Sequence, residues 1–257
     1  WISKQQRQER MLLMQLFSQH VSTEVADTIW AAREQLLQDG RIRPRKITAT
    51  VLFVDLEGFT AMAEQSEPHA LMEWLNTYLM SMTNVIVEHK GVVDDFFGDR
   101  VKANFGMPLE HTQVSDIRQD AMNAVQCGLA LFHEVQRLNQ RLSQHALPIG
   151  KVRIGIATGP VVGGTVGSMQ RLKYTSVGDT VNIAARLEQL GKDQSILAST
   201  QGFGSLFVNE VTHAHLDDRW ITEEIGLVSL PGRQDPVRVH RVMSGPSEWT
   251  SLHSNHV

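Results

Sequence analysis

The sequence predicts an α+β fold, and three observations support this. An apolar strand near residue 50 leads into a helical region. A Gly-Asp turn near residue 98 separates two short apolar runs. A long helical pattern then precedes another apolar strand near residue 152. Strand, helices, strand, strand, helix and strand in this order form a ferredoxin-like β-α-β-β-α-β core, here with an added hairpin and an N-terminal helical segment.

The first strand is predicted at Thr50–Asp55, where apolar, β-branched and aromatic residues end in an acid. A charge at the end of a buried strand has to be paired, neutralised or bound to a metal, because an uncompensated buried charge is costly. The alternative is that Asp55 is an ordinary helix cap. Helical patterns follow over Phe59–Gln65 and Pro68–Lys90, and the apolar stripe of the second predicts a helix packed on the core.

Two short strands are predicted on either side of Gly98-Asp99, because Gly-Asp between apolar runs is typical of a hairpin. If they lie beside the first strand, Asp55 and Asp99 face each other. Two converging carboxylates repel unless a cation lies between them. Oxygen ligands with open positions suit Mg²⁺ or Mn²⁺ that carries phosphates.

The remaining elements follow from the same periodicities. We expect a long helix over Asp116–Leu142 and a strand over Val152–Ala157. The Gly-rich segment 159–167 and Tyr174–Val177 should form a hairpin, followed by a helix over Thr180–Leu190. Smaller strands and helices are expected between Ile196 and His240.

The chain divides into three parts. Residues 1–44 are predicted to be N-terminal signalling helices and a linker, residues 45–243 the main domain, and residues 244–257 a flexible polar tail. The amphipathic helix over Ser3–Phe17 either forms a dimer seam or packs on its own domain. Because the chain starts at Trp1, we expect an upstream sensor region that is missing from this fragment.

Composition restricts the class of protein. Net charge is −4, so no general basic surface for nucleic acid is expected. The sequence contains no run of about 18 apolar residues, so it predicts no membrane span. The single cysteine, Cys127, excludes an internal disulfide framework and favours a reducing compartment. We therefore expect a cytoplasmic domain, either free or belonging to a larger membrane-anchored receptor.

Several ordered motifs resemble the class III nucleotidyl cyclases, the adenylyl and guanylyl cyclases of bacterial type. These motifs are Phe53–Thr60 (FVDLEGFT), Phe97–Asp99 (FGD), Gly159–Ser168 (GPVVGGTVGS) and Tyr174–Glu188 (YTSVGDTVNIAARLE). The resemblance covers roughly residues 45–243 and implies the palm-type version of the predicted core. Motifs in order at compatible spacing are far more specific than one short pattern.

The resemblance implies a set of site residues. Asp55 and Asp99 match the two acids that bind two Mg²⁺ or Mn²⁺ ions per site, and the carbonyl of Leu56 matches a further ligand. The turn of Glu57, Gly58, Phe59 and Thr60 matches the segment whose amides hold the β- and γ-phosphates. Asn182 and Arg186 match the pair that orients the ribose and neutralises the α-phosphate. In this family the site forms between two chains, so a homodimer with two sites is expected.

The base-reading positions leave the nucleotide open. Asp95 stands where many adenylyl cyclases have Lys, and its carboxylate suits the N–H donors of guanine. Thr175, at the partner position, is common in bacterial adenylyl cyclases. A third interpretation is that Asp95 turns to solvent or pairs with Lys102.

Two further positions depart from the family pattern. Pro231 replaces a phosphate-clamping Lys, a role that Arg233 is expected to take over. Arg100 stands where a small residue is usual, and it either reaches phosphate or hinders the site.

The sequence therefore predicts an adenylate cyclase that converts ATP to 3′,5′-cyclic AMP and pyrophosphate by two-metal-ion catalysis. The first alternative is a guanylyl cyclase acting on GTP. The second is a catalytically silent module that dimerises or binds nucleotide. A diguanylate cyclase is not favoured, because its Gly-Gly-Asp/Glu-Glu-Phe signature is absent from the sequence.

Overall fold

The computed structural model describes residues 30–38, 41–108, 110–142, 150–168, 171–192 and 204–246. The helix expected over Ser3–Phe17 lies outside these residues. The tail expected after residue 243 lies outside them from residue 247 onward.

The described chain combines helices with one large mixed sheet and one small hairpin. The strands are β1 (Leu37–Gln38), β2 (Arg41–Ile42), β3 (Arg45–Leu56), β4 (Val92–Phe97), β5 (Arg100–Phe105), β6 (Val152–Ser168), β7 (Arg171–Val177), β8 (Gly204–Asn209), β9 (Ile221–Val228) and β10 (Val237–Ser244). The helices are α3 (Arg33–Leu36), α4 (Phe59–Gln65), α5 (Pro68–Glu88), α6 (Val114–Leu142), α7 (Asp179–Leu190) and α9 (Glu210–His213).

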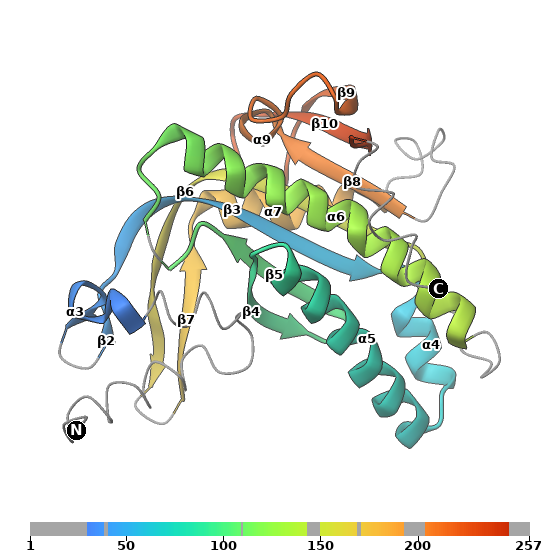
Figure 1. Ribbon diagram of the computed structural model, residues 1–257. Helices are drawn as coiled ribbons and strands as arrows, with labels where there is room; N and C mark the ends of the chain where they lie inside the picture. Colours follow the sequence, from blue (N-terminus) through green and yellow to red (C-terminus); the bar gives the residue numbers. More distant parts are fainter. Residues whose placement is uncertain are drawn as a thin grey trace.

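The large sheet has the order β4-β5-β3-β6-β8-β10-β9, and β7 pairs with the far part of β6. β3 lies between β5 and β6, antiparallel to both, while β6 and β8 run parallel. This confirms the predicted ferredoxin-like core and places the two central strands, β3 and β6, under the helices (Figure 1).

The two faces of the sheet carry separate helices. Leu52, Val54 and Leu56 of β3 point to the face covered by α5 and α6. Val51 and Phe53 point to the opposite face, which α7 covers. Because side chains alternate along a strand, Asp55 belongs to the α7 face. Among the described helices, none combines the length and apolar character needed to cross a membrane.

β6 is much longer than the six residues predicted, because the Gly-rich segment continues the strand instead of ending it. Its glycines lie where neighbours approach the backbone closely. A Cβ at Gly163 would lie 2.5 Å from the Tyr174 hydroxyl, and one at Gly164 would lie 3.2 Å from the Cα of Pro44. The predicted hairpin with Tyr174–Val177 is confirmed, since β6 and β7 pair from Val162↔Val177 to Ser168↔Arg171.

Candidate active site

The two predicted metal acids lie together at one end of β3. Asp55 is the penultimate residue of β3, and Asp99 lies in the tight turn that joins β4 to β5. The turn depends on Gly98, whose φ of 68° is in the left-handed region that favours glycine. The backbone N–H of Leu56 donates to Oδ2 of Asp99 over 3.0 Å. Pairing of β3 with β5 therefore brings the two strand ends, and with them the two acids, to one place.

The two carboxylates influence each other's protonation. Burial, followed by the nearby negative charge of Asp55, raises the pKa of Asp99 to about 6. The hydrogen bond from the Leu56 amide opposes this rise. Both acids are less than a tenth exposed. A cation between them would remove the repulsion, so the pair has the chemistry of a divalent-metal site.

Two arginines and a glutamate surround Asp55. Arg153 lies opposite Asp55 in the β3–β6 register, and its Nη2 donates to Asp55 Oδ2 over 2.6 Å and to the Leu56 carbonyl over 3.2 Å. Its Nε also donates to the fully buried Glu188 of α7 over 3.2 Å. Arg100 donates to the other Glu188 oxygen over 2.5 Å, with its Nη2 4.0 Å from Asp55. Arg100 thus links α7 to Asp55.

The turn after β3 is fixed by glycine and by aromatic stacking. Gly58, with φ 83°, begins α4, and no side chain of the described residues caps this helix. Phe59 stacks on Trp74 of α5 with 5.8 Å between ring centroids, and Trp74 stacks on Tyr78. Glu57, Gly58 and Thr60 are exposed. The first amides of α4 are therefore presented beside the two acids without a competing side-chain partner.

The second set of predicted residues lies on α7. Asn182 is exposed, and Arg186 donates to the side chain of Gln189, one turn further on, over 2.8 Å. Arg233, in the β9–β10 connection, forms an ion pair with Asp179 in the first turn of α7. Among the described residues, no hydrogen bond or ion pair joins Asn182, Arg186 or Arg233 to Asp55 or Asp99. Asp55 and Asp99 thus form one group of predicted site residues, and Asn182, Arg186 and Arg233 form another.

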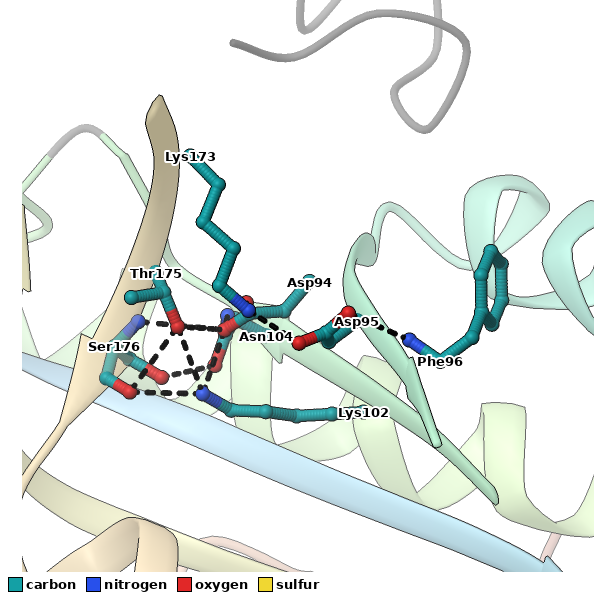
Figure 2. A network of polar contacts seen from close by, with 8 residues as sticks. All are labelled: Asp94, Asp95, Phe96, Lys102, Asn104, Lys173, Thr175 and Ser176. Atoms are coloured by element: carbon teal, nitrogen blue, oxygen red, sulfur yellow. Dashed lines mark hydrogen bonds and ion pairs between the residues drawn. The ribbon is translucent and has the colours of Figure 1, made fainter. Parts of the chain in front are cut away.

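A third group is a polar network between β4, β5 and β7 (Figure 2). Its centre is Asp94, whose Oδ2 accepts from Lys102 Nζ at 2.6 Å, Asn104 Nδ2 at 2.9 Å, Thr175 Oγ1 at 2.9 Å and the Ser176 amide at 3.3 Å. Burial lowers the pKa of Lys102, and the negative charge of Asp94 opposes this effect. Thr175 is thus held by Asp94, which the sequence analysis did not select.

Asp95 has a different partner from the one considered. It lies opposite Lys102 in the β4–β5 register, yet the ion pair that Asp95 forms is with Lys173 of β7, two residues before Thr175. The pairing with Lys102 was wrong, because the irregularity between Val93 and Asp95 turns Asp94 towards Lys102. Asp95 and Thr175 lie in the same region without contacting each other through a described hydrogen bond.

Sequence reasoning missed Arg153, Glu188 and Asp94. For Arg153 the signal is a lone charge inside the apolar run 152–157. For Glu188 the signal is an acid four residues after the buried Ala184, on the apolar side of α7. No signal identified Asp94, because a bulge in β4 breaks the alternation of buried and exposed positions.

A family profile, curated proteins and solved structures all relate this chain to nucleotidyl cyclases. The profile of the family described as "Adenylate and Guanylate cyclase catalytic domain" matches residues 43–237. Adenylate cyclase 1 of Rhizobium meliloti is 38% identical over 152 residues, which cover 58% of this chain and 22% of that protein. This chain therefore spans about a fifth of the length of that relative.

Two solved structures resemble the fold. The adenylyl cyclase CyaB from P. aeruginosa is 28% identical with a TM-score of 0.70, over 80% of this chain and 98% of that one. The guanylyl cyclase Cya2 is 32% identical with a TM-score of 0.66, over 79% and 95%. Since the profile covers most of the chain and Cya2 is matched along nearly its whole length, this chain belongs to the adenylate and guanylate cyclase catalytic domain family.

Proposed function

We propose that the chain is a homodimeric purine nucleotidyl cyclase that converts ATP to 3′,5′-cyclic AMP and pyrophosphate. The observation that carries this proposal is the convergence of Asp55 and Asp99 beside the uncapped first turn of α4. Two carboxylates next to free backbone N–H groups provide sites for divalent cations and for phosphate oxygens in one place. Membership of the cyclase family supports the reaction class.

The residues present fit two Mg²⁺ or Mn²⁺ ions. Asp55, Asp99 and the Leu56 carbonyl are hard oxygen ligands. The pKa of Asp99 is raised first by burial and second by the negative charge of Asp55, and a cation would relieve the second effect. No group of three or more His, Cys, Asp or Glu side chains suited to a metal occurs in the part of the chain that the structure describes. The triphosphate would therefore supply much of the coordination. When bound, the ions would lower the pKa of the ribose 3′-hydroxyl and neutralise charge on the phosphates.

The chain's own residues position the substrate. The amides of Gly58, Phe59 and Thr60 bind the β- and γ-phosphates, whereas the amide of Glu57, also predicted for this role, donates to the Lys151 carbonyl over 2.8 Å. The stacking of Phe59 on Trp74 holds this turn in place. On the other half-site, Asn182 orients the ribose and Arg186 neutralises charge that develops on the α-phosphate. Arg233 neutralises the terminal phosphates. Its ion pair with Asp179 ties it to the same helix as Asn182.

The two half-sites are supplied by different protomers. Within one chain, no described hydrogen bond or ion pair connects the acids with Asn182 or Arg186, and in this proposal a second copy brings the other half. The β6–β7 arm exposes Val162, Val166 and Val177, and Val162 and Val177 face each other across the arm. Exposed apolar side chains on a paired arm suit burial against another chain. A two-fold arrangement then yields two equivalent sites.

ATP is the proposed substrate because Thr175 occupies the base-reading position. GTP is the second candidate, and Asp95 is the observation that favours it, since a carboxylate accepts from both N–H donors of guanine. Its ion pair with Lys173 weakens that argument, because the ammonium offers a donor beside the acceptor. The proposed place of the domain is the cytoplasm.

The test is turnover by the purified chain with Mn²⁺ and either ATP or GTP, with the products separated by chromatography. Cyclic AMP from ATP supports the proposal. Cyclic GMP from GTP, without cyclic AMP from ATP, transfers the assignment to the guanylyl alternative. Absence of both products from a folded dimer leaves the silent module.

A further inference from the structure

Asp94, on β4, is a buried carboxylate of which only one oxygen is satisfied. Its Oδ2 collects the four donors described above, whereas its Oδ1 has no hydrogen-bond partner among the described residues. The side chain is 1% exposed, and the ammonium of Lys173 stays 3.8 Å from Oδ1. A buried acceptor without a donor is unfavourable, so Oδ1 is a position that a ligand donor would satisfy.

Towards any further ligand, the hydroxyl of Thr175 can act only as a hydrogen-bond acceptor. Lys102 Nζ donates to this hydroxyl over 3.2 Å, and an ammonium has donors only. The hydroxyl therefore directs its single hydrogen to Asp94 Oδ2, 2.9 Å away. What remains on Thr175 is a lone pair, and the neighbouring Oδ1 of Asp94 is likewise an acceptor.

The network has an inner and an outer layer (Figure 2). The inner layer, Asp94 with Thr175 and Lys102, is buried. The outer layer is the ion pair of Asp95 with Lys173, whose side chains are 32% and 44% exposed. The outer pair offers both a donor and an acceptor and so suits either purine. The inner layer offers two acceptors and is therefore selective.

We propose that Asp94 is a specificity-determining residue of this chain, whose Oδ1 accepts, together with the Thr175 hydroxyl, from the 6-amino group of adenine. This inference rests on the proposed cyclase function. Guanine and hypoxanthine carry a carbonyl oxygen at the same position, which would face two acceptors. Lys102 is a positioning residue, because its ammonium forces the orientation of the Thr175 hydroxyl.

The sharpest test is Asp94→Asn. Because the Oδ2 position receives four donors, the amide of the new side chain would place its oxygen there and its NH₂ group at the Oδ1 position. The acceptor that meets the 6-position thereby becomes a donor, without a change in volume. The variant should favour inosine triphosphate over ATP by about tenfold or more relative to the parent.

The matched control is Asp218→Asn, the same chemical change at an exposed aspartate in another part of the chain. Asp218 does not belong to the polar network, so the ATP-to-ITP ratio should stay within about threefold of the parent value. Thr175→Val is a second variant, which removes one of the two acceptors. It should lower the preference for ATP without creating one for ITP, because it adds no donor.

Two measurements are made on each dimeric variant. One is kcat/KM for ATP and ITP with Mn²⁺. The other is the equilibrium affinity for 3′-deoxy-ATP and 3′-deoxy-ITP, which lack the attacking hydroxyl and cannot cyclise. The binding measurement remains informative if no variant turns over, so failure of the cyclase function is separable from failure of this inference.

A reversal of preference in Asp94→Asn, with Asp218→Asn close to the parent, supports the inference. An unchanged ratio in a folded Asp94→Asn variant overturns it. A shift of equal size in Asp218→Asn also overturns it, because the change in the ratio would then not depend on the polar network. A parent that binds 3′-deoxy-ITP as well as 3′-deoxy-ATP contradicts it directly.

Discussion

At the scale of single residues, Asp55 and Asp99 are the charges on which the proposed chemistry depends. Asp55→Asn and Asp99→Asn each remove one negative charge and keep the volume. Each change should lower turnover by about 100-fold or more, because the metal ions would lose a negatively charged ligand and bind less tightly. Steady-state cyclase assays, together with circular dichroism to confirm folding, check this. Near-parental turnover in either folded variant would remove that residue from the metal pair.

The raised pKa of Asp99 predicts a dependence of stability on pH. Its carboxyl titrates near 3.8 in a reference environment and at about 6 in the folded chain without metal. Between these values the folded state holds more protons than the unfolded state, so the free energy of unfolding falls as pH rises from about 4 to about 6. The Asp99→Asn variant has no carboxyl at this position, so its free energy of unfolding should not show this fall.

We therefore expect Asp99→Asn to be more stable than the parent at pH 7, by on the order of 1–2 kcal/mol. At pH 3.5 the difference should vanish, because the parent carboxyl is protonated in both states. Urea unfolding in the presence of EDTA at several pH values measures this difference in the free energy of unfolding. A difference that does not vary with pH would argue against the repulsion between Asp55 and Asp99.

The residue scale also shows where sequence reasoning reached its limit. Asp55 and Asp99 could be paired from sequence because each follows an apolar strand, and the β3–β5 register then brings the strand ends together. Arg153 could not be placed at the site, because its position depends on the β3–β6 register, across 98 residues. Asp94 could not be separated from Asp95, because the bulge in β4 exchanges their directions.

At the scale of elements, α7 is held against the two acids by Glu188. This carboxylate is fully buried and receives Arg100 and Arg153. Glu188→Ala would remove the carboxylate that pairs with both arginines. Removal of one member of a buried ionic group typically costs about 3–5 kcal/mol of stability. Chemical denaturation should show a loss of this order.

The control for this variant is Arg141→Ala, which removes an ion pair between the well-exposed Arg141 and Glu134. Arg141 is exposed and Glu134 keeps its ion pair with Arg137, so stability should change by less than about 1 kcal/mol. If Glu188→Ala were no more destabilised than Arg141→Ala, the buried network would not hold α7 in place.

Gly155 sets the distance between β6 and α7. A Cβ at this position would lie 2.2 Å from the Ala184 carbonyl oxygen and 2.2 Å from the Glu188 nitrogen, both of which are backbone atoms. Gly155→Ala must therefore displace α7, with a stability loss of about 1–3 kcal/mol and a large loss of turnover. Denaturation curves and kcat are the measurements. A variant with parental values of both would show that α7 can shift without effect on the site.

The fold itself was predictable at this scale because helical and strand periodicities are local. The order β-α-β-β-α-β follows from runs of apolar residues and from Gly98-Asp99, all of which lie within single elements. The length of β6 was not predictable, because its glycines reflect contacts with Tyr174 and Pro44, which come from other parts of the chain.

At the scale of the whole molecule, the proposed mechanism requires a second copy of the chain. In this proposal Asp55 and Asp99 form one half-site, and α7 carries the other half with Asn182 and Arg186. The exposed valines of the β6–β7 arm support the proposed homodimer, in which each site is shared.

The measurement that tests this central claim most directly is complementation between Asp55→Asn and Arg186→Ala. Each variant alone should be nearly inactive. In a mixed dimer, one site has both parental halves and the other has neither. Equal mixing with free exchange should therefore restore about a quarter of the parental activity. Native mass spectrometry of differently tagged chains confirms that mixed dimers have formed. Recovery to about this level is the predicted result, and confirmed mixed dimers without recovered activity would contradict the shared site.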